Sequence, residues 1–195
     1  MITLVSIAVI IICSLFFSVL YMLSVQPESL SLRFGKKAYT ICGIIRAISM
    51  LFMFGIIAGY ILFAFGKTFN YQIAGNNILP VRIAGVIIVV VTAVIMVIGM
   101  INAGKEASFP DKNTKMYQGI YNYMRHPQTL GEMLFWLGIA MILNSLTLFI
   151  FSFIWIPVFI LFTVIEDNDL ALRFGQEYVE YTKKVSIFWK KPDTK

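Results

Sequence analysis

Residues 125–167 read RHPQTLGEMLFWLGIAMILNSLTLFIFSFIWIPVFILFTVIED, and this stretch decides how the chain folds. A charged group opens it, a long apolar run follows, and an acidic pair closes it. One helix over residues 133–165 would reach roughly 50 Å at about 1.5 Å per residue, too long for a bilayer core of about 30 Å. Asn144-Ser145 near its middle indicates a turn. The stretch therefore predicts a helical hairpin with helices over residues 127–143 and 146–165.

Two prolines fit this hairpin. Pro127 suits the first position of a helix, where its missing N–H leaves no hydrogen bond unmade. Pro157 falls inside the second helix and is expected to kink it.

The composition places the whole chain in a membrane. Of its 195 residues, 59% are hydrophobic and only 13% are charged, whereas a soluble domain has roughly a quarter of its residues charged. The first apolar segment has no basic residues before it and no small-residue cleavage site after it. We therefore expect a retained span there instead of a cleaved signal peptide.

Working outward from the hairpin, three further apolar runs are long enough to cross a bilayer, over residues 2–23, 38–65 and 83–101. Together with the hairpin they predict an all-α polytopic protein with five transmembrane helices. Gly55 and Gly59 in the second run allow close helix approach, either within the bundle or in a dimer.

Lysines and arginines set the expected orientation. Those in the loop after the first span, in the segment after the third and in the tail are Arg33, Lys36, Lys37, Lys105, Lys112, Lys115, Arg125, Arg173, Lys183, Lys184, Lys190, Lys191 and Lys195. The other side has Lys67 and Arg82. The positive-inside rule therefore predicts an outside N-terminus and a cytoplasmic C-terminus. The net charge of +6 reflects this topology, and we expect no nucleic-acid partner.

The tail is expected to form an amphipathic cytosolic helix. Leu170, Phe174, Tyr178 and Tyr181 recur at helical spacing, and Gly175 interrupts the pattern at modest cost. We divide the chain into a three-helix scaffold, residues 1–101, and a ligand-binding region, residues 102–195, within one integrated domain.

Ionisable groups at the two ends of the hairpin form the candidate site. Charges at a bilayer boundary are costly and indicate function. Because a hairpin brings its ends together, Arg125 and His126 are expected near Glu166 and Asp167. A basic group at a helix N-terminus favours an anion and an acidic pair favours a cation. The pattern therefore predicts a zwitterionic ligand, such as an amino-acid head group.

Two motifs across the hairpin resemble those of a known family. They are Gly119-Ile-Tyr121-Asn-Tyr123-Met-Arg125-His126-Pro127 before it, and Glu166-Asp167, Leu170, Phe174-Gly175, Glu177-Tyr178 and Tyr181 after it. The arrangement is similar to that of the integral-membrane isoprenylcysteine carboxyl methyltransferases and the phospholipid N-methyltransferases grouped with them. It covers residues 104–185, a little under half the chain.

The resemblance implies a cytosolic pocket for S-adenosyl-L-methionine. The residues that match the family's cofactor-lining positions are Asn113, Thr114, Lys115, Met116, Tyr121, His126, Pro127, Gln128, Thr129 and Glu166. The implied reaction is methyl transfer to a membrane-embedded lipid or small apolar acceptor.

Two positions depart from the family pattern. Thr129 stands where tyrosine is frequent, and Phe162 stands where the prenylcysteine enzymes have an arginine for the substrate carboxylate. A lipid amine, a thiol or another apolar acceptor is therefore favoured over a carboxylate.

Two residues are candidates for the catalytic step. Arg125 either contributes to the site or extends to phosphate head groups. Glu132 is either paired, with Arg46 or Arg125, or serves as general base for the acceptor. His126 is the one histidine and has no cysteine companions nearby, so we expect no metal.

Two other functions remain open from the sequence. Membrane sterol and steroid reductases that bind NADPH share the R-H-P-x-x-x-G-E text around Gly131-Glu132. A scaffold without activity that keeps the fold is the other. The sequence does not predict the oligomeric state.

Overall fold

The computed structural model describes residues 1–66, 68–112 and 118–189, and these fold into helices, which confirms the all-α prediction. The α-helices are α1 (Ile2–Ser24), α2 (Pro27–Phe34), α3 (Lys37–Ala64), α4 (Leu79–Ala103), α5 (Pro127–Ile142), α6 (Leu146–Ser152), α7 (Trp155–Phe174) and α8 (Gln176–Lys184), with 3₁₀ turns η1 (Gly104–Ala107) and η2 (Gly119–Asn122).

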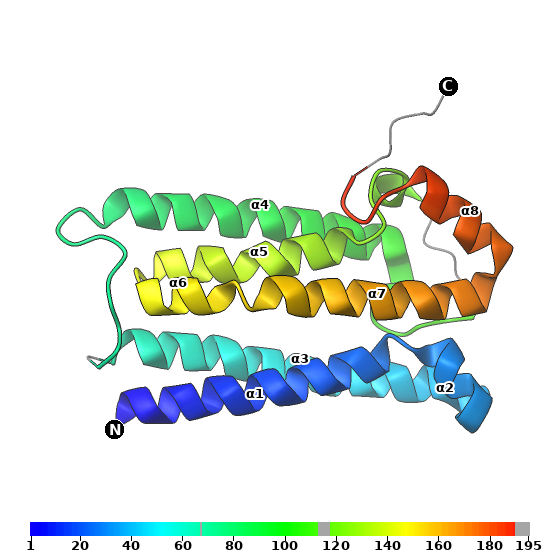
Figure 1. Cartoon of the computed structure of the whole chain (residues 1–195), viewed down its shortest axis with the longest axis horizontal. Coiled ribbons are helices and arrows are strands. Elements are labelled where there is room, and N and C mark those ends of the chain that lie inside the picture. Colours follow the sequence, from blue (N-terminus) through cyan, green and yellow to red (C-terminus); the bar gives the residue numbers. More distant parts are fainter. Residues whose placement is uncertain (67, 113–117, 190–195) are drawn as a thin grey trace.

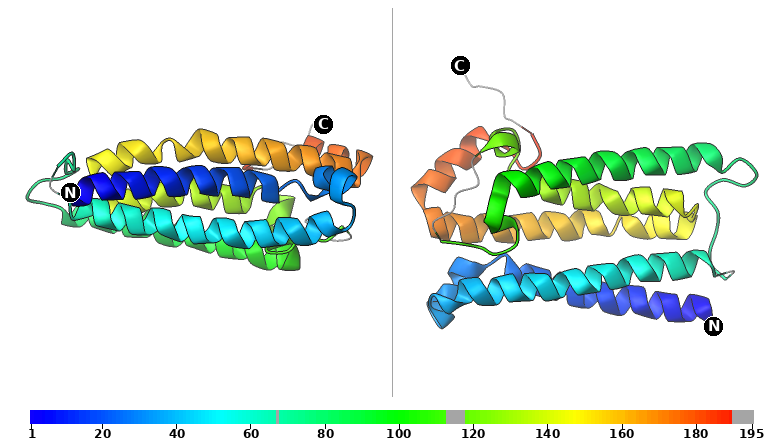
Figure 2. Two further views of the ribbon diagram at one scale, coloured as in Figure 1. Left: turned by 90° about the horizontal axis from the view of Figure 1, so that it is seen from below. Right: turned by 180° about the vertical axis from the view of Figure 1, so that it is seen from behind.

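The long helices lie side by side in one elongated bundle (Figures 1 and 2). Helix α1 packs on α3, α4 packs on α5, and α7 contacts both α1 and α5. The short helices α2 and α8 gather at the end of the bundle away from the N-terminus (Figure 1). We call this the site end.

The hairpin turn forms where the sequence predicts it. Asn144 adopts a positive φ of 53°, a conformation that asparagine tolerates. Its side chain accepts a hydrogen bond from Ala74 N at 3.0 Å and donates one to Ala74 O at 2.9 Å. Ser145 then caps α6, because its hydroxyl accepts from Leu148 N. The turn is thus fixed to the α3–α4 loop.

The second arm of the hairpin breaks one turn before Pro157. Helix α6 ends at Ser152 and α7 begins at Trp155, so Pro157 lies in the first turn of α7. A proline ring clashes with the carbonyl four residues earlier, here that of Phe153, which explains the position of the break.

The end of α7 differs from the sequence prediction. The helix does not stop near residue 165 but continues to Phe174, and Gly175 with φ 60° ends it before α8 starts. Gly175 therefore separates two helices that the periodicity predicts as one. A residue with a positive φ ends a helix, and glycine adopts this conformation without steric cost.

Four segments are long and apolar enough to span a membrane within the described residues: Ile2–Ser24, Lys37–Ala64, Leu79–Ala107 and Leu146–Phe174. Helix α5 has 16 residues and would span about 24 Å, short of a core of about 30 Å. The structure thus supports a polytopic membrane protein, with α5 as a shorter member of the bundle.

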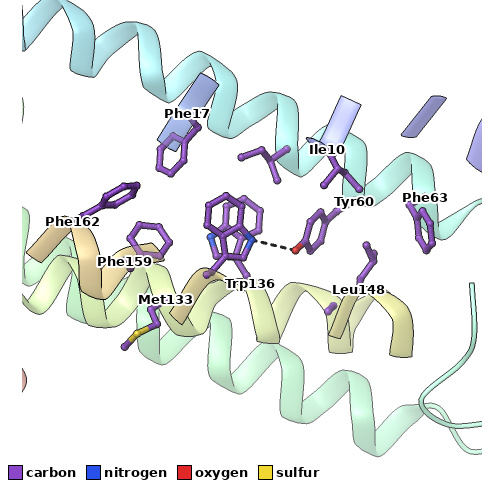
Figure 3. Close-up of a cluster of buried hydrophobic side chains, with 12 residues drawn as sticks. Ile10, Phe17, Tyr60, Phe63, Met133, Trp136, Leu148, Phe159 and Phe162 are labelled. Carbon is purple, nitrogen blue, oxygen red and sulfur yellow. Dashed lines mark hydrogen bonds between the residues drawn. The ribbon is translucent and has the colours of Figure 1, made fainter. Parts of the chain in front are cut away.

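An aromatic cluster holds the middle of the bundle together (Figure 3). Trp136 of α5 and Trp155 of α7 stack with ring centroids 5.1 Å apart. Tyr60 of α3 packs against Trp136 and accepts a hydrogen bond from the Trp155 indole N–H at 3.4 Å. Phe162 is buried here beside Phe17. Its burial in the core accounts for an apolar side chain at this position.

Small residues let neighbouring helices approach closely. A Cβ on Gly138 of α5 would lie 3.0 Å from Gly85 O of α4 and 2.8 Å from Val89 Cγ2. Gly55 and Gly59 of α3 face Cys13 and the Ile10 region of α1 in the same way. The glycine pair in the second span therefore serves packing within the bundle.

We predict that Gly138→Ala lowers thermal stability, because the added methyl group must push α4 and α5 apart. Overpacking of this kind costs about 1–3 kcal/mol. The measurement is the unfolding temperature of the purified protein in lipid nanodiscs. Gly75→Ala is the matched control, since a Cβ there has no heavy atom within 4 Å. Equal unfolding temperatures for the two variants would contradict the close packing of α4 on α5.

Candidate functional site

The start of α5 and the polar part of α7 contact each other at the site end. His126 Nε2 lies 2.8 Å from Asp167 Oδ1, and His126 Nδ1 lies 3.2 Å from Glu166 Oε2. Arg125 Nη1 lies 2.7 Å from Asp167 Oδ2. The prediction that Arg125 and His126 meet Glu166 and Asp167 is therefore confirmed.

Asp167 also fixes the tail against this pair of segments. Its Oδ1 accepts a hydrogen bond from the Tyr178 hydroxyl of α8 at 2.5 Å. The backbone N–H groups of Arg125 and His126 donate to Ile187 O at 3.1 Å. The Asp167 carboxylate and the backbone of the tail thus connect the start of α5 to α7, α8 and the tail, which follow much later in the sequence.

His126 is held in its charged form. Both ring nitrogens face carboxylate oxygens, so both donate when the imidazole is protonated. Burial, the largest single effect, lowers the pKa of His126, but hydrogen bonds to Asp167 and Glu166 outweigh it and raise the pKa to about 9. The basic residues Arg125 and His126 therefore contact the acidic residues Glu166 and Asp167 directly. From the sequence, a zwitterionic ligand is instead expected between these two groups. The Glu166 side chain is partly buried, with 24% of its surface exposed.

A small cavity, here called the inner cavity, lies beside this network. It measures about 30 Å³ and is lined by Tyr21, Arg46, Ala103, Glu106, Ala107, Tyr121, Arg125, His126, Pro127, Gln128, Thr129 and Glu166. The structure thereby brings together the cofactor-lining candidates that it describes. Asn113, Thr114, Lys115 and Met116 lie outside the described residues.

A larger cavity, here called the outer cavity, adjoins the inner one. It measures about 350 Å³ and is lined by Tyr21, Arg46, Ala47, Met50, Met100, Ala107, Ser108, Phe109, Gln128 and Glu132. Tyr21, Arg46, Ala107 and Gln128 line both cavities. Met100 and Phe109 are about half exposed, at 48% and 55%. The outer cavity therefore reaches from the polar site towards the apolar surface of the bundle.

The structure separates the two catalytic candidates. Arg125 is paired with Asp167 on the inner cavity. Glu132 lines the outer cavity, and its Oε2 is buried with no hydrogen-bond partner among the described residues. Neither Arg46 nor Arg125 forms an ion pair with Glu132 in this part of the chain. The predicted structural pairing of Glu132 is therefore not observed.

Two lining residues from the N-terminal scaffold are missing from the sequence prediction. Arg46 of α3 donates from Nη1 to Glu106 O and Ala107 O, each at 3.0 Å, and from Nη2 to Ser24 O at 3.2 Å. It thus ties the end of α1 and the η1 turn to α3. Arg46 could have been found from the sequence, because it is a single charged residue within an apolar run. Tyr21 is an aromatic residue in an apolar run, and nothing in the sequence marks it as a site residue.

Buried acidic groups brace the same end of the bundle. Glu106 forms an ion pair with Arg173 of α7 at 2.5 Å, with side chains 6% and 1% exposed. Asp169 of α7 accepts hydrogen bonds from the backbone N–H groups of Glu28 and Ser29 at 3.0 and 2.7 Å. The polar residues after the acidic pair are therefore structural, and they fix α2 and η1 around the site.

The fold and the two cavities define a helical membrane protein with a polar ligand site at one end of its bundle. Comparison with known proteins specifies the family. The phospholipid methyltransferase family model matches residues 80–177, and the chain belongs to that family. Methyltransferases of this family use S-adenosylmethionine.

Individual relatives agree with this membership. The chain is similar to the protein-S-isoprenylcysteine O-methyltransferase of Saccharomyces cerevisiae, with 31% identity over 130 residues, 62% of this chain and 52% of that protein. It is 28% identical over 112 residues to a probable protein-S-isoprenylcysteine O-methyltransferase of Oryza sativa subsp. indica, covering 54% of this chain and 59% of that protein. The chain thus spans a little over half the length of the curated relatives it matches. Both names favour a methyltransferase over the NADPH-dependent reductase.

We predict that His126 makes stability fall at alkaline pH. Its folded pKa of about 9 lies above the ordinary value of about 6.5. Its contribution is therefore complete below about pH 6.5 and is lost as the pH rises through 9. Unfolding temperatures in nanodiscs, measured from pH 6 to 10, should show the wild type losing its advantage over His126→Gln across this window. Parallel curves for the two proteins would disprove a charged His126.

Proposed function

We propose that this protein transfers a methyl group from S-adenosylmethionine to an apolar acceptor held in the membrane. One observation supports this most strongly. The polar inner cavity is lined by the family-matched residues Tyr121, His126, Gln128 and Glu166, and it adjoins the outer cavity, which reaches towards the apolar surface of the bundle. Such an arrangement suits a polar donor on one side and a lipid-soluble acceptor on the other.

The donor atoms at the inner cavity fit the methionine head group. The N–H groups in the first turn of α5 have no intrahelical partners and favour a carboxylate. Arg125 Nε is buried without a hydrogen-bond partner among the described residues. Glu166 favours an ammonium group. When bound, S-adenosylmethionine supplies an electrophilic methyl group on a sulfonium.

The inner cavity must widen to admit a nucleoside, because about 30 Å³ is little more than the room that one water molecule takes. The tail over residues 185–189 and helix α8 close this side through Ile187 and Tyr178. In the proposal these contacts loosen for entry and reform around the ligand. Water is then excluded during methyl transfer, which depends mainly on positioning.

The catalytic candidates take different roles in this proposal. Arg125 is a positioning residue, because its ion pair with Asp167 fixes the start of α5. Glu132 on the outer cavity is the general base that takes the acceptor's proton. Phe162 is buried in the aromatic core, so an acceptor carboxylate has no cation from that position.

We further propose five crossings, with α5 as the fourth and a cytoplasmic site end. Helix α5 runs back along the bundle from the site end to the hairpin turn (Figure 1). The basic residues described at the site end are Arg33, Lys36, Lys37, Lys105, Lys112, Arg125, Arg173, Lys183 and Lys184. This distribution supports an outside N-terminus.

We predict that the purified protein in nanodiscs binds S-adenosylhomocysteine in isothermal titration calorimetry. Glu166→Gln should weaken binding at least about tenfold, because it removes a charged partner of the ligand ammonium. Glu180→Gln on α8 is the control, since that carboxylate is exposed and, within the described part of the chain, pairs along its own helix with Lys183 and Gln176. It should bind like the wild type. No heat of binding with the wild-type protein would end the methyltransferase proposal.

The orientation is tested by fusions at the C-terminus. A green fluorescent protein fused after residue 195 and produced in a bacterial inner membrane should fluoresce, because it folds in the cytoplasm. An alkaline phosphatase fused at the same position should be inactive. The reverse pair of results would contradict the proposed orientation.

A further inference from the structure

Three residues that line the outer cavity each carry a buried polar atom with no hydrogen-bond partner among the described residues. These atoms are Arg46 Nε, Gln128 Nε2 and Glu132 Oε2, from α3 and α5. Unpartnered buried polar atoms are rare in folded proteins and each needs an explanation. Three of them on one cavity point to a ligand group that completes their hydrogen bonds.

The chemical inventory of these atoms is specific. Arg46 Nε and Gln128 Nε2 are donors, whereas Glu132 Oε2 is an acceptor when the carboxylate is ionised. A hydroxyl group accepts two hydrogen bonds and donates one. It is thus the simplest group that matches two donors and one acceptor.

Charged head groups match the same atoms less well. A carboxylate would accept from Arg46 and Gln128 but would face the Glu132 carboxylate. An ammonium would donate to Glu132, but it would face the Arg46 guanidinium. It has no acceptor atom, so the Arg46 Nε–H would stay unpaired. No ion pair joins Arg46 and Glu132, both of which the structure describes. A neutral group that bridges the two leaves the site without net charge.

The rest of the lining describes the body of the ligand. Ala47, Met50, Met100 and Phe109 are apolar, and a volume of about 350 Å³ falls at the small end of ligand pockets, which measure roughly 300–1,000 Å³. Tyr21, Arg46, Ala47 and Met50 lie outside residues 80–177. Four of the ten described lining residues therefore come from helices outside the segment matched by the family model.

We propose that the outer cavity binds a neutral hydroxyl group on an apolar body, an amphiphilic alcohol or phenol, between Arg46, Gln128 and Glu132. This inference rests on the proposed methyl transfer and names its acceptor class. The hydroxyl oxygen gives up one of its two accepted hydrogen bonds, and the freed lone pair forms a bond to the methyl carbon while the sulfur–methyl bond breaks and leaves its electron pair on sulfur. The hydroxyl proton passes to Glu132, so a methyl ether and S-adenosylhomocysteine result.

The first test is equilibrium binding with three probes that differ in the head group alone. Protein in nanodiscs saturated with S-adenosylhomocysteine is given 4-octylphenol, 4-octylbenzylamine or 4-octylbenzoate at equal mole fraction in the lipid. We expect 4-octylphenol to raise the unfolding temperature more than either charged probe. A larger rise with the amine or the carboxylate would overturn the inference.

Variants at Glu132 separate binding from proton transfer. Glu132→Leu removes the acceptor and an unpartnered buried carboxylate, so its basal stability should equal or exceed that of the wild type while its affinity for 4-octylphenol falls about tenfold. Glu132→Gln keeps an acceptor oxygen. It should bind 4-octylphenol within about threefold of the wild type but lose methyl transfer by at least about 10²-fold.

Ser14→Ala is the matched control, because Ser14 Oγ is also buried and unpartnered but lines neither cavity. It should behave as the wild type with every probe. Unchanged 4-octylphenol binding in Glu132→Leu would refute the site. Binding of S-adenosylhomocysteine is measured separately, and it distinguishes the methyl-transfer proposal from the hydroxyl-acceptor proposal. A protein that binds S-adenosylhomocysteine but prefers a charged probe refutes the hydroxyl acceptor alone.

Discussion

The carboxylate of Asp167 is the interaction on which the site end depends. It accepts from Arg125 and His126 at the start of α5 and from Tyr178 of α8. A charge at this depth is costly unless it is paired and hydrogen-bonded. Here every contact of the carboxylate is also a tie between segments. Together with Glu166 it therefore balances the charges of Arg125 and His126, and it fixes the geometry of the inner cavity.

Around that network the protein divides its tasks between two groups of helices. The polar side belongs to α5, α7 and α8, of which α5 and α7 lie within the segment matched by the phospholipid methyltransferase family. Both cavities also need Tyr21 of α1 and Arg46 of α3, and the outer cavity adds Ala47 and Met50 of α3. In the proposed function, the acceptor side therefore depends more on helix α3, which lies outside the matched segment, than the donor side does.

The sequence predicts the features that follow from local geometry. A short turn returns the chain, so Arg125 meets Asp167 and His126 meets Glu166, and the residue types at Asn144 predict the turn. The length of α7 is not predicted, because its polar residues after Ile165 suggest an exit from the bilayer while the backbone continues to Gly175. Helix α2 could have been found from Pro27 at its start and Gly35 at its end.

Residues that depend on helix pairing could not be predicted from one sequence. Arg46 stands out as a charge, but only the packing of α3 beside η1 shows that it lines both cavities. The partners of Glu132 were also undetermined, because helical spacing gives a face and not the neighbour opposite it. The tertiary packing determines both the cavity-lining position of Arg46 and the surroundings of Glu132.

Hydrogen–deuterium exchange of the protein in nanodiscs, with and without S-adenosylhomocysteine, tests the central claim most directly. Ligand between the start of α5 and the polar part of α7 should slow exchange in peptides from residues 118–130 and 163–187. Peptides from the loop over residues 70–78, at the other end of the bundle, should not change. Protection confined to that loop, or none at the site end while the ligand is bound, would contradict the account.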